Sequence, residues 1–161
     1  MTWVKDKLTD VIHAIAEELL LEINHDTKLF PEDSDEYIEL TAGGTANIFS
    51  DWAELVDNNA VTFSSKIVGT GAHISAVMVE DLDTSDKRYI MEIGYGDGTG
   101  PGTTTVLRHR FMSGDVKKLD AIQQVPIRID QIPVSSTVYW RMKCETLSAK
   151  CFIHIRYHFH S

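Results

Sequence analysis

The chain has 161 residues, a mass of 18.1 kDa, 43% hydrophobic residues and a formal net charge of −9 at pH 7. This length suits one domain with an ordinary hydrophobic core and argues against a second full domain. The acidic balance argues against a nucleic-acid partner, because neutralising phosphates requires clustered lysines and arginines.

The negative charge is concentrated at the amino-terminal end. Residues 1–60 carry 14 acidic and three basic side chains, whereas residues 61–161 carry 10 acidic and 12 basic ones. A partner with a basic surface, or the other half of the same molecule in an assembly, would complement this asymmetry. The longest near-apolar run, VIHAIAEELLLEI, is interrupted by one histidine and three glutamates. We therefore expect no membrane span, no signal peptide and no membrane partner.

The first expected element is an amphipathic helix over residues 1–26, since apolar residues recur there at steps of three and four. Most of these apolar residues alternate steps of four and three, as in the seam of a coiled coil. A seam of about two heptads is marginal alone, so we predict an oligomerisation or docking interface, the alternative being a helix packed on its own domain. The predicted interface residues are Val4, Leu8, Ile12, Ile15 and Leu19.

After the helix, residues 27–36 contain a proline and several acidic residues, which predicts an acidic linker. From residue 37 onward the hydrophobic period is two, and clusters of turn-forming residues separate the apolar segments. The predicted strands are 37–41, 52–56, 61–68, 73–80, 87–95, 104–112, 124–129, 136–145 and 151–159. We therefore predict a mainly β domain over residues 37–161, an antiparallel β-sandwich like a jelly roll. Pro126 marks its strand as an edge strand or a bulged one.

The last two predicted strands are expected to pair as a hairpin. In TVYWRMKC and in CFIHIRYHF, every second residue is apolar or cysteine, so these residues share one face of each strand. A turn centred on Leu147 and Ser148 would set apolar against apolar at every step and place Cys144 opposite Cys151.

Cys144 and Cys151 allow three interpretations: a disulfide, two buried thiols, or half of a zinc site. Both side chains belong to the apolar face, and no second pair of cysteines or histidines has zinc-site spacing. We therefore predict buried side chains that face each other, with the bond state left open between a disulfide and free thiols.

The closing segment CFIHIRYHFHS places His154, His158 and His160 on the polar face of the last strand. His158 and His160 lie about 7 Å apart at Cα, within reach of one ion, but they supply only two ligands from one chain. A metal would require several chains around a symmetry axis. We predict a contact surface and no cofactor, and we keep His158 and His160 as weak metal candidates.

Two further motifs are incomplete. DLDTSDKRYIME places Asp81, Asp83, Ser85 and Glu92 at calcium-loop positions, but Asp86 stands where that loop requires glycine, so we predict a polar turn. GYGDGTGPGTTT has the glycines of a phosphate loop without its Gly-Lys-Ser/Thr ending, which predicts an exposed connection. No nucleophile motif or carboxylate pair is identifiable, so we predict that the protein is not an enzyme.

Five segments carry a resemblance to a known group: TAGGTANIFSDWAELVDNNAVTFSSKI, HISAVMVEDLDTSDKRYIMEIGYGDG, VLRHRFMSG, IPVSSTVYWRMKCET and FIHIRYHFH. Over about residues 37–160, the chain resembles small β-sandwich proteins encoded among the structural genes of tailed bacteriophages and prophages. The most telling piece is IPVSSTVYWRMKCE, in which an Ile-Pro turn leads into a strand that alternates small and aromatic residues. The group has no catalytic residues to carry over.

The resemblance implies a virion component assembled in the host cytoplasm, either a capsid decoration or a neck, collar or tail adaptor. We therefore predict a homo-oligomer, as a trimer or hexamer, that docks on other virion proteins. The alternative is a carbohydrate- or receptor-binding module that binds a surface glycan through the GDGTGPG loop or the outer face of the hairpin. The outer-face residues considered for that role are Tyr139, Arg141, His154 and His158. A metal-dependent enzyme built on the histidines is the third hypothesis.

Overall fold

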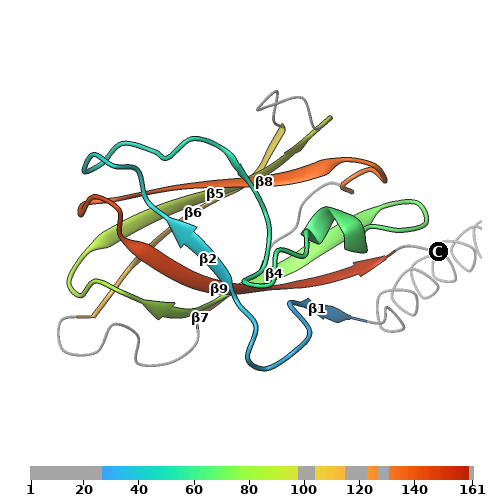
Figure 1. The fold of residues 1–161 in the computed structure, drawn as a ribbon, viewed down its shortest axis with the longest axis horizontal. Coiled ribbons are helices and arrows are strands. Elements are labelled where there is room, and N and C mark those ends of the chain that lie inside the picture. The colour runs from blue at the N-terminus through green and yellow to red at the C-terminus, as the bar shows by residue number, and fades with distance from the viewer. Residues whose placement is uncertain (1–26, 98–103, 115–122, 127–130, 160–161) are drawn as a thin grey trace, which may run out of the picture.

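The structure, a computed structural model, describes residues 27–97, 104–114, 123–126 and 131–159. Over these residues the chain is mainly β, with two antiparallel sheets that pack as a sandwich (Figure 1), which confirms the predicted class. The predicted helix at 1–26 lies outside the described residues, together with its interface residues Val4, Leu8, Ile12, Ile15 and Leu19. His160 and most of the GDGTGPG loop also lie outside them.

The first sheet, here called the β9 sheet, has the order β1-β9-β4-β7, and β2 pairs with β9 beside β1. Its strands are β1 (Lys28–Phe30), β2 (Ile38–Thr41), β4 (Ala72–Leu82), β7 (Gln123–Pro126) and β9 (Lys150–Phe159). The second, the β8 sheet, has the order β3-β8-β5-β6. Its strands are β3 (Ala53–Glu54), β5 (Arg88–Gly96), β6 (Thr104–Met112) and β8 (Thr137–Cys144).

The core fills the space between the two sheets. The inward residues of the two carboxy-terminal strands are buried as their alternation predicts, except Phe159 at the end of β9, which is only partly buried. The buried ones are Val138, Trp140, Met142 and Cys144 in β8, and Cys151, Ile153, Ile155 and Tyr157 in β9. The 3-10 helix η1 (Phe63–Lys66) adds the ring of Phe63, whose centroid lies 5.4 Å from that of Phe30 and 5.1 Å from that of Tyr157. These aromatic contacts tie β1 and η1 to β9.

The predicted hairpin between the last two strands is wrong. β8 pairs with β3 and β5, whereas β9 pairs with β1, β2 and β4, so the two strands lie in different layers of Figure 1. Cys144 is opposite Tyr89, and Cys151 is opposite Leu40 and Leu82. Residues 145–149 carry the chain from one sheet to the other. Alternation specifies which face of a strand is buried but not which strand lies beside it, so the same pattern fits both arrangements.

Three other predicted elements compare as follows. Residues 61–68 were expected as a strand but contain η1, because the Thr62 hydroxyl accepts a hydrogen bond from the Ser65 N–H and caps a helical turn. Part of the predicted linker, Lys28–Phe30, instead forms β1 and pairs with β9. β7 lies at the edge of its sheet, which confirms the edge position predicted from Pro126.

Both cysteines are free and buried, so the predicted burial is confirmed and the pairing through a hairpin is wrong. Burial raises the pKa of the Cys144 thiol and that of the Cys151 thiol above the ordinary value of 9.0. We expect both thiols to resist a disulfide reagent at pH 8 in the native protein. After unfolding without reductant, two thiols are expected to react, and thiol titration measures both states.

The same pKa shifts predict an alkaline loss of stability. Because folding raises the thiol pKa, its contribution to the free energy of unfolding is complete below pH 9 and declines as the pH rises above that value. This decline is expected to be shallower in Cys151→Ala than in the parent protein, as measured by urea unfolding from pH 8 to pH 10. Rapid labelling of either native thiol would contradict the burial.

Candidate functional site

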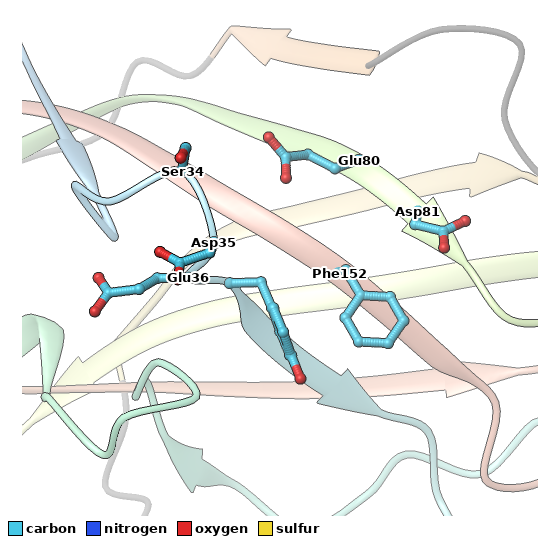
Figure 2. A pocket seen from close by; sticks show the side chains of 7 residues that line it. Ser34, Asp35, Glu36, Glu80, Asp81 and Phe152 are labelled. Carbon is cyan, nitrogen blue, oxygen red and sulfur yellow. The ribbon is translucent and has the colours of Figure 1, made fainter.

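A pocket of about 440 Å³ opens on the outer side of the β9 sheet, and we call it the acidic pocket (Figure 2). Its volume is in the range of about 300–1,000 Å³ that is typical of ligand pockets. Three segments line it: the connection between β1 and β2, the carboxy-terminal end of β4, and β9. The lining residues are Ser34, Asp35, Glu36, Tyr37, Glu80, Asp81 and Phe152.

A β-bulge turns two consecutive carboxylates of β4 toward this side. The register of β4 against β9 shifts between Val79 and Asp81. Glu80 and Asp81 therefore both lie away from the core, between the buried residues Val79 and Leu82. Bulges commonly redirect side chains in this way. Without the bulge, one of the two carboxylates would point into the core.

Two aromatic rings form the apolar wall of the pocket. The ring centroids of Tyr37 and Phe152 are 5.2 Å apart, and the rings meet edge to face at 81°. The backbone of Tyr37 is fixed by Asn58, whose side-chain Oδ1 accepts from the Tyr37 N–H at 3.1 Å. The Asn58 N–H in turn donates to the Tyr37 carbonyl oxygen at 2.9 Å. The wall is therefore held by hydrogen bonds as well as by packing.

The pocket contains four carboxylates, and none of its lining residues is basic. Glu36 accepts a hydrogen bond from Asn59 Nδ2 at 2.5 Å, and Asp81 accepts one from the Leu82 N–H at 2.7 Å. No hydrogen bond or ion pair reaches the Asp35 side chain from the described part of the chain. Asp35 therefore presents its charge to whatever enters the pocket.

Glu80 lies beside the buried side chain of His154. Its Oε2 lies 2.8 Å from Nδ1 of His154, which is ion-pair distance. The angles are not those of a hydrogen bond, so His154 Nδ1 is a buried atom without a hydrogen-bond partner in the described structure. An unsatisfied buried nitrogen of this kind is costly and therefore uncommon. It leaves the Glu80 carboxylate available to a stronger donor.

The opposite side of the sandwich is positively charged. On β5, β6 and β8, the outward residues alternate with core residues such as Tyr89, Met91 and Met142. We call this surface the basic face. Its charged residues are Arg88, Arg108, Arg110, Arg141 and Lys143, with Glu92 and Glu145 as the acidic ones.

Glu92 is the centre of the basic face, and its side chain is fully buried. Nε of Arg141 donates to Oε2 of Glu92 at 2.6 Å, and Nε of Arg108 donates to Oε1. The Arg108 side chain is 67% exposed, so it lies across the carboxylate as a cover. A buried carboxylate needs such partners, because losing its hydration without them costs several kcal/mol, about 2–7 even for an uncharged polar group.

Arg141 also lies between two aromatic rings. Its guanidinium carbon is 4.6 Å from the ring centroid of Phe49 and 4.5 Å from that of Trp52, and Nζ of Lys143 is 4.7 Å from Phe49. Such cation–π contacts add about 0.5–2 kcal/mol each. The backbone before Phe49 packs closely against Gly43, where a Cβ would collide with the Ile48 carbonyl oxygen.

A hollow of about 200 Å³ lies beside this network on the basic face. Two of its lining residues, Arg88 and Glu145, form an ion pair at 2.7 Å. The backbone N–H and the side chain of Arg88 both donate hydrogen bonds to Glu145, and these bonds hold the pKa of Glu145 below its usual value. Arg110 is exposed, and no hydrogen bond or ion pair to its side chain is found in the described ranges. Arg110 is thus a cation of this face that is open to a partner.

The residues considered for glycan binding do not form one surface. Tyr139 and Arg141 belong to the β8 sheet, whereas His154 and His158 belong to the β9 sheet. Tyr139 and His154 are each only 8% exposed. The hypothesis that these four residues share an outer face is wrong, because the two strands do not pair.

Of the two weak metal candidates, His158 and His160, only His158 belongs to the described residues. His158 stacks on His73, its partner in the register of β4 and β9, with ring centroids 5.5 Å apart. Glu92 of the incomplete calcium pattern binds two arginines instead. Among the described residues, no three side chains of histidine, cysteine, aspartate or glutamate are grouped so as to hold a metal.

Within the same ranges, no helix has the length and apolar character needed to cross a membrane.

Comparison with known proteins gives no family. No family model matches the chain, and no curated protein matches it. One similar solved structure is the Clostridium thermocellum N-terminal endo-1,4-β-D-xylanase 10B, as its CBM22-1 and GH10 modules complexed with xylohexaose. The two chains are 10% identical over 84% of this chain, with a TM-score of 0.40, and the match spans 26% of the xylanase chain. A likeness at this level carries no argument about function.

Sequence reasoning did not find the acidic pocket. Its residues come from the predicted linker, from the predicted strands at 37–41 and 73–80, from the predicted polar turn and from the polar face of the last strand. The acidic run PEDSDE is a signal in the sequence, but its approach to Phe152 depends on the pairing of β2 with β9. The charge of the basic face was visible only as a weak excess of basic residues after residue 60.

We expect Glu92→Gln to lower the free energy of unfolding by about 1–3 kcal/mol, because charged hydrogen bonds to two arginines are lost from a buried position. The matched control is Glu145→Gln, which removes an exposed ion pair from the same face and should cost less. Urea unfolding followed by tryptophan fluorescence compares the two. Equal losses would show that Glu92 is not the stabilising centre of this face.

Proposed function

We propose that this protein is a non-enzymatic structural subunit of a tailed-phage virion, which oligomerises and docks on the capsid, or on the neck or tail, as a decorating or adaptor subunit. The observation that carries the proposal is an acidic pocket on one outer surface and a cluster of basic side chains on the other. The acidic pocket has four carboxylates on one side, and the basic face has five cations on the other. A subunit with complementary surfaces is suited to repeated assembly.

The proposed architecture is a jelly roll preceded by an amphipathic helix over residues 1–26. The strand order supports it, because β2, β9, β4 and β7 lie in one sheet and β3, β8, β5 and β6 in the other. Eight-stranded jelly rolls of two sheets are typical of viral capsid and lectin domains. The resemblance of residues 37–160 to phage β-sandwich proteins favours the first of these classes. A fold hosts many functions, so assembly itself has to be measured.

We expect the full chain to form a trimer or hexamer in light scattering and to sediment with phage particles produced from the same genome. Deleting residues 1–26 is expected to lower the oligomeric mass or the bound fraction, because the predicted seam at Leu8, Ile12 and Ile15 is removed. The sandwich contains its own core, so circular dichroism of the shortened chain is the control for folding. A stable monomer whose attachment to particles survives the deletion would overturn the proposal.

A second candidate function is carbohydrate or receptor binding, and the acidic pocket is the observation that favours it. An aromatic wall beside carboxylate acceptors suits a ligand that carries hydroxyl groups. If this is the function, Phe152→Ala should abolish binding on a glycan array while leaving the fold intact. If the parent protein gave no signal above background on the array, carbohydrate binding would be ruled out as the function.

A further inference from the structure

We propose that the acidic pocket of one copy receives the basic face of a second copy, with the guanidinium of Arg110 entering between the Phe152 wall and the carboxylates of Asp35 and Glu80. The contact deepens the proposed function, since it rests on self-assembly and names the two surfaces that meet. It is heterologous: each copy offers its pocket to one neighbour and its basic face to another.

The fold already contains one arginine that is held by aromatic rings and a carboxylate. Arg141 lies between the rings of Phe49 and Trp52, and its Nε donates to a carboxylate oxygen of Glu92 at 2.6 Å. Planar guanidinium groups suit such sites because they stack on rings and donate to carboxylates at the same time. Aromatic rings beside a carboxylate thus hold an arginine within this fold.

The acidic pocket offers the same groups without an arginine. Phe152 and Tyr37 supply the rings, and Asp35 and Glu80 supply carboxylates that accept no hydrogen bond from the described residues. A guanidinium has five N–H donors and would satisfy both carboxylates. Nδ1 of His154 lies 2.8 Å from Glu80 without forming a hydrogen bond, so the oxygens of this carboxylate remain able to accept from a guanidinium.

The basic face supplies the matching side chain. Arg108 is bound to Glu92, and Arg88 is bound to Glu145. Arg110 lies between them on β6, exposed and without a partner in the described ranges. Exposed Met112 follows two residues later on the same side, and its side chain is 48% exposed. Arginine and methionine are both enriched in the centre of protein interfaces.

A second copy is the occupant that the charges favour. The lining of the pocket contains four carboxylates and no lysine or arginine, so a cationic group complements it better than a neutral sugar does. A cationic group of the right shape is present on every copy, on the other side of the sandwich. Because the two surfaces differ, the contact forms a closed ring if the rotation between copies closes and a filament if it does not.

Disulfide trapping tests the contact without altering any charge in it. Ser34→Cys marks the pocket, and Met112→Cys marks the basic face, in separate full-length chains. The native thiols of Cys144 and Cys151 are buried, so they are not expected to form disulfides between copies. After mild oxidation, a mixture of the two variants is expected to give a covalent dimer linking positions 34 and 112. Each variant alone is expected to give none, because a heterologous contact brings neither position onto itself.

Charge variants then test the ionic basis. Arg110→Gln in the Met112→Cys chain is expected to lower the yield of the dimer about tenfold, since a charged hydrogen-bonded pair is lost. Lys28→Gln in the same chain is the matched control, because it removes an equal charge from an exposed residue outside the basic face and should leave the yield unchanged. A yield that 1 M NaCl does not lower would overturn the ionic contact.

The remaining outcomes separate this contact from the virion role. An oligomer that binds particles but gives no link between positions 34 and 112, or that links position 34 to itself, overturns the contact and leaves the proposed function standing. A strong heterologous link in a protein that no particle binds supports the contact and overturns the virion role. A monomer that gives no link overturns both.

Discussion

The structure depends on the burial of one face of every long strand against the opposite sheet. Ile153 and Tyr157 of β9 meet Met142 and Trp140 of β8 in a single core, and the aromatic ring of Phe63 closes one end of it. Because this burial uses only alternate residues, the other residues of each strand are left outside. The outer surfaces are therefore the part of the sandwich that is free to carry charge and to contact a partner.

Those outer surfaces are organised in different ways. On the β8 sheet, a buried carboxylate at Glu92 gathers two arginines and, through Arg141, the rings of Phe49 and Trp52. On the β9 sheet, a bulge next to Glu80 and the connection before β2 bring carboxylates around Phe152. Among the described residues, Arg110 on the basic face and Asp35 in the acidic pocket are both left without an ionic or hydrogen-bonded partner. These two groups of opposite charge are the physical basis for proposing that copies of the chain meet.

The strands of the long antiparallel pairs could be predicted because period-two patterns survive over eight or more residues, as in Arg88–Gly96 and Lys150–Phe159. The short elements could not. Lys28–Phe30 is too short to show a period, and the Thr62 cap competes locally with an extended strand. The prediction of a hairpin was wrong for a different reason. Five connecting residues are enough either for a turn within one sheet or for a crossing between sheets, and either arrangement buries the same side chains.

By itself, the sequence determined the β class, the inward residues of β8 and β9, the choice of an edge or a bulge for Pro126, and the excess of acid before residue 60, because each follows from local period, local backbone chemistry or composition. Only the tertiary structure decided that Cys144 and Cys151 belong to different sheets, that Glu92 binds two arginines, and that Asp35, Glu80 and Phe152 line one pocket. Strand partners and bulges are chosen by the packing of the whole sandwich, and no local pattern encodes that choice.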